Sequence, residues 1–421
     1  MTISAMTISA MTISTLEGAR RADSNDPLRD YRSNFELPKG VIYLDGNSLG
    51  PPPRNALDRL QRTAQHEWRE GLITSWNQVK GSKAGWIDLP KQAGAKIAAI
   101  IGADERDVIV ADSVSVNIFK LAAALLQRGQ VGAIAYERGE FPTDGYILQG
   151  LARLTGARLI EIEPDDKDAL ATENISVLIK SVAHYKSAIV ADVAAWETAA
   201  QSAGTAMIWD LSHGAGVLKL DLQDNGARFA VGCGYKYLNG GPGAPAYLYV
   251  DTKEANTLDQ PLSGWMGHAA PFDFSGTYAP AAGIERFACG TPPILSLAAL
   301  DASLDLFDGI SLEDVENKAT ALGNLFVQRA NALGLTSISP QPGERRGGHI
   351  SLEHDHGYAL IQALIEQGVI GDFRAPSLMR FGFSPLFLQY TDVYTATEAL
   401  AQTLATQPWK EERFNKKGRV T

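Results

Sequence analysis

Short apolar runs alternate with amphipathic segments through much of the chain, and this alternation constrains the fold more than any other feature. The segments between most of the runs have apolar residues at helical spacing, with helices predicted at 53–71, 89–101 and 115–127. Strands are predicted at 41–44, 108–111, 133–136, 157–162, 188–193, 206–209 and 246–250. Strands that alternate with helices form mostly parallel sheets covered by helices. The sequence therefore predicts an α/β fold up to about residue 310.

The pattern changes after residue 310, where strands and helices no longer alternate regularly. Strands are predicted at 349–352 and 378–383, and helices at 312–333, 358–367 and 390–406. We therefore predict a large domain at 41–310 and a smaller α+β domain at 311–421.

The first 15 residues consist of three near-copies of one five-residue segment. They contain no basic residue and no sustained apolar run, so they do not resemble a secretory signal. We predict that residues 1–40 form a partly disordered leader.

Charge and cysteine content exclude several classes of function. A chain of 421 residues with a net charge of −10 has no basic field to gather phosphates, which argues against nucleic acid as a main partner. No apolar run approaches the roughly 20 residues that span a membrane. Only Cys233 and Cys289 are present, so a disulfide framework is not expected and a reducing cytoplasm fits.

A lysine in a glycine-rich segment is the strongest functional signal. Lys236 lies between two tyrosines with glycines on both sides, and the predicted strand upstream ends at Asp210. A lone lysine is usually a solvated surface residue. An acid at a strand end followed by a lysine in a flexible turn is, however, typical of pyridoxal phosphate (PLP) enzymes. The amine binds the cofactor covalently, and the carboxylate keeps the pyridine nitrogen protonated.

Two further positions have anion-binding chemistry. Ser115 follows a predicted strand at the start of a predicted helix, and this position fits both a phosphate site and an ordinary N-cap. Arg380 lies in an apolar strand and therefore needs an anion. A substrate carboxylate and a buried Asp or Glu both satisfy that need. The cluster of His349, Glu353 and residues 354–356 has no common zinc spacing, and we predict a solvated strand end there.

Seven segments together resemble the cofactor and substrate motifs of kynureninase, in the same order and with similar spacing. They are 43–50 (YLDGNSLG), 141–144 (FPTD), 210–216 (DLSHGAG), 235–241 (YKYLNGG), 264–268 (GWMGH), 290–294 (GTPPI) and 379–383 (MRFGF). The resemblance implies a PLP-dependent fold type I (aspartate aminotransferase-like) enzyme. It further implies cleavage of L-kynurenine to anthranilate and L-alanine in tryptophan catabolism and NAD biosynthesis. Family members are homodimers with shared active sites.

The resemblance also assigns roles to individual residues. Lys236, Tyr235 and Asp210 match catalytic positions. Cofactor-binding positions are matched by Val114, Ser115, Phe141, Pro142, Thr143, Asp144, Ser181, Asp210, His213, Tyr235, Lys236, Trp265 and Thr291. Substrate positions are matched by Ser48, Trp76 and Arg380. Trp265 and Thr291 match residues that reach the site from the partner subunit. Trp76 and Thr291 favour L-kynurenine over 3-hydroxykynurenine.

This sequence departs from the family pattern in two places, and two alternatives remain. Gly234 stands where the family usually has a hydroxyl residue, and the amino-acid sequence of segment 182–188 differs from the one usual in the family. A cysteine desulfurase-like or aminotransferase-like enzyme is the alternative within PLP chemistry, although Cys233 and Cys289 are poorly placed for a mobile nucleophile. A non-enzymatic PLP-binding protein is disfavoured because binding alone needs no carboxylate-binding arginine.

Overall fold

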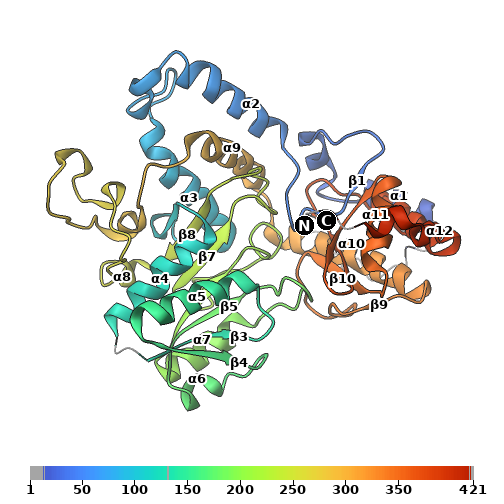
Figure 1. Ribbon diagram of the computed structural model, residues 1–421. Helices are drawn as coiled ribbons and strands as arrows, with labels where there is room; N and C mark the ends of the chain where they lie inside the picture. The colour runs from blue at the N-terminus through green and yellow to red at the C-terminus, as the bar shows by residue number, and fades with distance from the viewer. Residues whose placement is uncertain (1–12, 14, 130–131, 417, 419–421) are drawn as a thin grey trace, which may run out of the picture.

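A seven-stranded sheet is the centre of the larger part of the molecule (Figure 1). The computed structural model describes residues 13, 15–129, 132–416 and 418. In spatial order the strands are β2 (Val108–Val110), β8 (Ala246–Val250), β7 (Phe229–Cys233), β6 (Ala206–Asp210), β5 (Ile175–Ser181), β3 (Ala133–Glu137) and β4 (Arg158–Ile162). Neighbours from β7 to β4 are parallel, whereas β8 is antiparallel to both β7 and β2. The predicted α/β fold with a mainly parallel sheet is confirmed.

Helices cover both faces of this sheet, which explains why its strands are apolar throughout. Ile208 packs in the cluster that includes α4 (Val114–Arg128) and α5 (Pro142–Thr155). Met207 and Trp209 pack in the opposite cluster with α3 (Leu89–Ile101) and α7 (Val193–Ala203). Alternate strand residues point to opposite faces, so a strand covered on both sides is continuously hydrophobic. The shorter helices on this part are α2 (Arg54–Arg62), α6 (Ala169–Thr172), α8 (Thr252–Ala255) and α9 (Ile294–Leu304).

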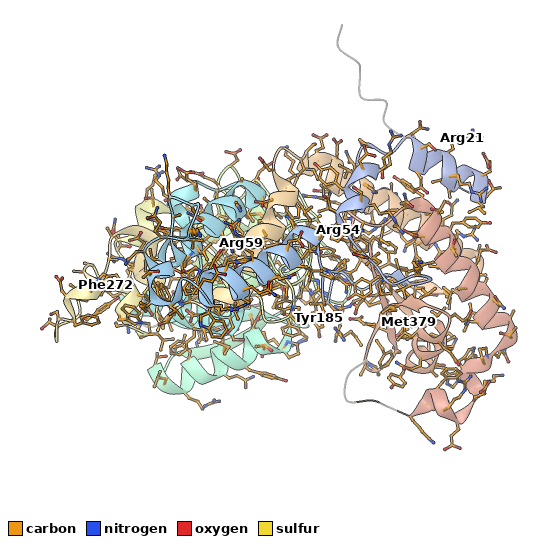
Figure 2. All side chains as sticks on the ribbon, turned by 90° about the horizontal axis from the view of Figure 1, so that it is seen from above. Arg21, Arg54, Arg59, Tyr185, Phe272 and Met379 are labelled. Atoms are coloured by element: carbon orange, nitrogen blue, oxygen red, sulfur yellow. The ribbon has the colours of Figure 1, made fainter. Side chains whose placement is uncertain are left out.

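A four-stranded antiparallel sheet forms the centre of the C-terminal part. Its order is β12 (Asp372–Arg374), β13 (Leu378–Gly382), β10 (His349–Glu353) and β9 (Thr336–Ser337). The helices are α10 (Leu312–Ala332), α11 (Gly357–Glu366) and α12 (Tyr390–Thr406). Figure 2 shows Tyr185 of the larger part lying toward Met379 of β13. The segment after β5 contacts β13 here, since Arg380 donates to the Tyr185 carbonyl.

The N-terminal segment associates with the C-terminal part. β1 (Ile42–Tyr43) pairs in parallel with β11 (Val369–Ile370). α1 (Leu16–Ser24) lies against α12, where Asp23 accepts hydrogen bonds from the first residues of that helix. Helical structure therefore occupies part of the predicted leader, and most of the repeats lie outside the described residues. The domain division at residue 310 stays a prediction.

One strand prediction was wrong, two strands of the larger sheet were missed, and one helix was predicted correctly only in part. Segment 188–193 is not a strand, because Ala188 has a φ of 61° and only isolated bridges form at Ile189 and Val190. β5, which ends at Ser181, and β7 were both missed. The helix predicted at 53–71 changes to a π-helix at Thr63–Trp68. No helix in the described part of the chain is long and apolar enough to cross a membrane.

Candidate active site

The turn that carries Lys236 is held by close backbone contacts. The amide of Gly50 donates to the carbonyl of Tyr235 at 2.8 Å, and a Cβ on Gly50 would lie 2.3 Å from the Lys236 carbonyl. At Gly234, a Cβ would lie 2.7 Å from the Pro245 carbonyl oxygen. Packing therefore accounts for the glycine that replaces the usual hydroxyl residue. These contacts also bring the loop containing Ser48 toward the lysine.

Lys236 contacts a buried histidine. Its Nζ lies 3.0 Å from Nε2 of His213, which follows β6 by three residues. Burial and the nearby charge of Lys236 hold the pKa of His213 well below its usual value. The imidazole is therefore neutral at pH 7, and its Nε2 can accept a hydrogen bond from the Lys236 amine.

Three buried carboxyl groups gather near Lys236. Asp210 ends β6, and its Oδ1 accepts from the Ser212 amide at 2.8 Å. Burial first, and then the charges of Asp210 and Glu140, raise the pKa of Asp144 well above its usual value. Burial likewise raises the pKa of Glu140 to about 7. An acidic cluster of this kind favours a cation within it.

Unsatisfied buried atoms mark the same place. Oδ2 of Asp144 and Nδ1 of His213 have no hydrogen-bond partner among the residues that the structure describes. A buried polar atom without a partner is costly, and in native proteins it usually has a functional reason. A ligand with a protonated ring nitrogen and further polar atoms fits this cluster. The residues present are therefore compatible with PLP.

The predicted phosphate site lies at the start of α4. Ser113 caps the helix, since its side chain accepts from the Val116 amide at 3.3 Å. The ordinary N-cap is therefore Ser113, and Ser115 lies in the first turn. At the adjoining strand end, Asp112 pairs at 2.7 Å with Lys120, which is fully buried. Helix N-termini bind anions readily, so the phosphate role of Val114 and Ser115 remains a prediction with suitable local geometry.

The remaining predicted cofactor residues are spread around this site. Ser181 ends β5 and donates from both its amide and its hydroxyl to Glu140. Phe141 precedes α5, which begins with Pro142 and Thr143, and its ring lies edge-on to Tyr185 at 5.3 Å between centroids. These contacts connect the acidic cluster to Tyr185.

Three predicted residues lie on other segments. Thr291 lines a cavity of about 430 Å³ that also includes Asp112. Trp265 is exposed and packs edge-on against Phe272. Trp76 packs edge-on against Trp86. Their roles in binding stay predictions.

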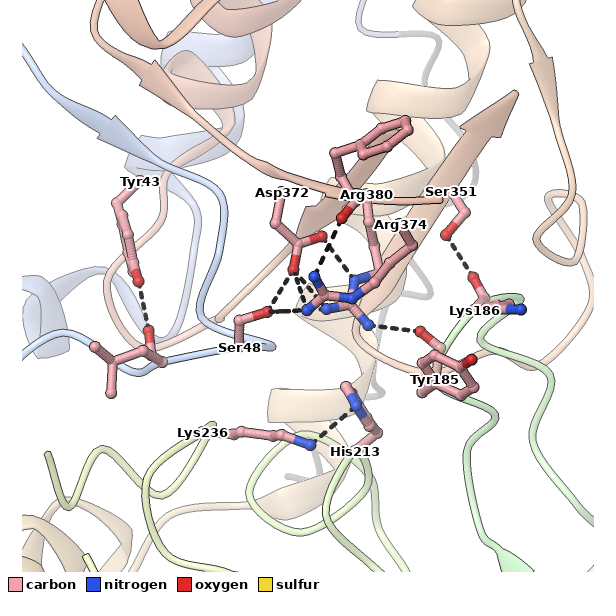
Figure 3. A network of polar contacts seen from close by, with 12 residues as sticks. Tyr43, Ser48, Tyr185, Lys186, His213, Lys236, Ser351, Asp372, Arg374 and Arg380 are labelled. Carbon is pink, nitrogen blue, oxygen red and sulfur yellow. Dashed lines mark hydrogen bonds and ion pairs between the residues drawn. The ribbon is translucent and has the colours of Figure 1, made fainter. Parts of the chain in front are cut away.

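A second charged cluster lies beside the first (Figure 3). Arg380 on β13 donates from Nε and Nη2 to the two carboxylate oxygens of Asp372, at 2.9 and 2.5 Å. Its Nη2 also donates to Ser48 Oγ at 2.9 Å, and its Nη1 donates to the Tyr185 carbonyl at 2.7 Å. Arg374 lies 2.8 Å from Asp372 Oδ2. Arg380 is thus paired with a buried acid, which was one of its two predicted partners.

The two clusters are close enough to influence each other. The charges of Arg380 and Arg374 both contribute to the lowered pKa of His213, after burial and Lys236. In Figure 3, Lys236 and His213 lie on green loops of the larger part, below the arginine cluster. His213 therefore lies within electrostatic range of both Lys236 and the arginine cluster.

Sequence analysis missed Glu140, Asp372 and Arg374. Asp372 and Arg374 lie two residues apart on one strand, so they share a face. The register between β12 and β13 places Asp372 opposite Arg380. The signal available in the sequence was one acid and two arginines separated by even numbers of residues, which is the spacing of one face of a strand. Among the described residues no three His, Cys, Asp or Glu side chains are placed to hold a metal ion, and the zinc question stays a prediction. The solvated strand end predicted there was wrong at His349, which is fully buried on β10.

Comparison with known proteins identifies the family. Residues 315–400 match the model of the kynureninase C-terminal domain. The chain is 43% identical to a kynureninase from Burkholderia mallei (strain SAVP1), over 97% of this chain and all of that relative. It is 41% identical to a kynureninase from Pseudomonas fluorescens, over 95% of this chain and 98% of that one. The chain belongs to the kynureninase family.

Solved structures of other enzymes share the fold. The apo structure of a cysteine desulfurase from Thermococcus onnurineus NA1 has a TM-score of 0.77 at 18% identity, covering 90% of this chain and 98% of that one. A C-DES mutant with glycine covalently linked to its PLP cofactor also has a TM-score of 0.77 at 18% identity, covering 88% and 98%. The predicted PLP-dependent fold type I is confirmed.

Proposed function

We propose that this chain is a PLP-dependent hydrolase that converts L-kynurenine and water to anthranilate and L-alanine. The observation that carries the proposal is the placement of Lys236 between an acidic cluster and an arginine cluster. Membership of the kynureninase family supports it, with up to 43% identity along nearly the whole chain. The family and the fold together support PLP as the cofactor.

The acidic cluster and the start of α4 would hold the two ends of the cofactor. Lys236 would bind it covalently, and Asp210 would pair with its ring nitrogen. When bound, PLP supplies an electron sink for negative charge at the substrate Cα. Val114 and Ser115 would hold the phosphate, and Phe141 would lie against the ring. The other residues proposed to contact it are Pro142, Thr143, Asp144, Ser181, His213, Tyr235, Trp265 and Thr291.

Proton transfer is assigned to Lys236 and Tyr235. Lys236 removes the Cα proton once its amine is free, and neutral His213 orients that amine through the 3.0 Å contact. Cys233 beside it and burial raise the pKa of Tyr235 above its usual value, so the phenol keeps its proton. Tyr235 can therefore donate a proton to the leaving part of the substrate. Arg380 and Ser48 orient the carboxylate, and Trp76 lines the aromatic side.

The proposal includes a homodimer in the cytoplasm, acting in tryptophan catabolism and NAD biosynthesis. Exposed aromatic side chains after α8, among them Trp265, Phe272 and Phe274, supply apolar surface of the kind that partners cover. In Figure 1 this segment extends away from the larger sheet. Cys233 and Cys289 are both free thiols, which agrees with a reducing compartment.

Anthranilate fluorescence tests the proposed activity. Purified protein with PLP should release anthranilate from L-kynurenine, with a higher kcat/KM than for 3-hydroxykynurenine. L-cysteine with added dithiothreitol, which reduces a persulfide to sulfide, serves as the control for the desulfurase alternative and should yield no sulfide. Sulfide release from cysteine without anthranilate release from kynurenine would overturn the proposal.

A further inference from the structure

The two arginines of the second cluster differ in access to solvent. The side chains of Arg380 and Asp372 are each 2% exposed, whereas that of Arg374 is 34% exposed. All three belong to the β12–β13 pair, with Asp372 directly opposite Arg380. A ligand that arrives from solvent therefore meets Arg374 before it meets Arg380.

The hydrogen bonds of Arg380 are largely occupied by the protein itself. Four donor contacts engage its guanidinium, two to Asp372 and one each to Ser48 and the Tyr185 carbonyl. An arginine has five N–H groups, and its paired donors bind one carboxylate at a time. Because Asp372 occupies that paired arrangement, Arg380 has one N–H group left and can contact a second carboxylate only through a single hydrogen bond.

Arg374 keeps more of its donors available. Its Nη2 lies 2.8 Å from Asp372 Oδ2 and donates to Ser48 Oγ at 3.4 Å, while its Nη1 donates to the Phe373 carbonyl at 3.1 Å. Within the described residues, no hydrogen bond engages its Nε. This arginine therefore has N–H groups for an incoming anion without breaking its contact with Asp372.

The net charge of the cluster matches the binding of one anion. Burial opposes ionisation of Asp372, but the hydrogen bonds and charge of Arg380 keep its pKa below the usual value. Burial and the charge of Asp372 raise the pKa of the nearby Asp45 to about 8, so Asp45 is mostly neutral at pH 7. Two arginines against one ionised aspartate leave one net positive charge. A single carboxylate neutralises it.

We propose that Arg374 binds the substrate α-carboxylate, as an outer partner to Arg380, and that Asp372 holds the two guanidinium groups in place. Arg374 is thus a further substrate-binding residue, and Asp372 is a positioning residue. The proposal rests on the proposed function, because it takes the carboxylate to be that of L-kynurenine.

The test compares L-kynurenine with its carboxamide, in which the anionic group is neutral. The variants are Arg374→Gln and the conservative Arg374→Lys. Arg228→Gln is the matched control, because Arg228 is also 34% exposed and pairs with one acid, Glu254. Each protein is assayed for kcat and KM, for the absorbance of lysine-bound PLP, and for the rise in Tm that each ligand causes.

Arg374→Gln should raise KM for L-kynurenine by about ten- to a hundredfold, the range for loss of a charged hydrogen bond. KM for the carboxamide should stay within about twofold of wild type, and the cofactor absorbance should be unchanged. Arg374→Lys should fall between, because it keeps the charge without the planar donors. Arg228→Gln should match wild type with both ligands.

An equal change for the acid and the carboxamide, or no change for either, would overturn the proposal. If Arg374→Gln does not fold, Arg374→Lys carries the same comparison. A wild-type protein that releases no anthranilate would refute the proposed function instead. The difference in Tm between the acid and the carboxamide, present in wild type and lost in Arg374→Gln, would still support Arg374 as a carboxylate site in that case.

Discussion

The cluster around Lys236 and the cluster around Arg380 satisfy their charges in different ways. Near Lys236, Asp144, Asp210 and Glu140 gather with atoms that have no partner among the described residues. Around Arg380, every described charge has a partner, and Asp372 contacts both arginines. The first arrangement suits a resident cofactor that completes it. The second suits a substrate that comes and goes, because the buried Arg380 is already paired with Asp372 and the remaining positive charge lies on the partly exposed Arg374.

Replacing Lys236 should have the largest effect, and it should affect the first cluster and not the second. Lys236→Ala removes the covalent link to the cofactor and the group assigned to the Cα proton, so turnover and the absorbance of lysine-bound PLP should both disappear. The arginine cluster should be unaffected, and Tm should remain near that of wild type. Absorbance spectra, anthranilate assays and thermal melts measure these outcomes. Continued anthranilate release by this variant would remove Lys236 from the mechanism.

Replacing Asp210, the acid proposed to pair with the ring nitrogen of PLP, should have the next largest effect. Asp210→Ala should weaken cofactor binding and lower kcat by roughly two orders of magnitude or more even at saturating PLP, because a charged hydrogen bond is lost and the electron sink is weakened. Glu197→Gln is the control, since Glu197 is a buried acid that accepts from Trp209 on the same strand as Asp210. Near-normal turnover of Asp210→Ala at saturating PLP would assign the ring nitrogen to another residue.

A change in the arginine cluster should affect substrate handling and leave the cofactor in place. Arg380→Lys keeps the charge but loses the paired contact with Asp372. A loss of about 1.5–3 kcal/mol corresponds to roughly one to two orders of magnitude in kcat/KM. Steady-state kinetics beside a PLP spectrum give both readouts. Loss of the PLP absorbance in Arg380→Lys would show that the two clusters are not separate in function.

The smallest expected effect is a pH dependence of KM. Asp45 has a pKa of about 8, raised by burial and by Asp372, and it lies near Ser48, Arg374 and Arg380. A raised pKa means that Asp45 is neutral below pH 8 and negative above it. Its ionisation cancels the net positive charge of the cluster, so KM for L-kynurenine should rise above pH 8. The rise should be only a few-fold, because charge–charge interactions at a partly solvated site are weak. Asp45→Asn should abolish that rise, and a rise that persists in the variant would assign it elsewhere.

Much of the fold followed from local sequence patterns, whereas the partners of charged residues did not. The predicted bounds of α3, β8 and α12 match the structure because their periodicity and end signals are strong. β7 was missed because it is short and includes Gly232 directly before the glycine-rich turn. Segment 188–193 was predicted as a strand because it is apolar, but in the structure it is the connection that leads into α7.

For the site, Lys236 and Asp210 could be singled out because each stands in a short sequence motif, and their roles stay predictions. Asp372 was not recognisable, because its pairing with Arg380 depends on the register between two strands. The approach of Gly50 to the lysine turn is likewise a contact between distant segments. Residues whose roles depend on tertiary contacts of this kind require the structure.

The most direct test of the central claim is to locate the bound cofactor. Borohydride reduction of the PLP-loaded protein, followed by peptide mass spectrometry, fixes the cofactor to the lysine that holds it. We predict one phosphopyridoxyl group per chain, on the peptide that contains Lys236, and its loss in Lys236→Ala. A label on any other lysine, or an unlabelled protein that still converts L-kynurenine to anthranilate, would contradict the assignment of this cluster as the active site.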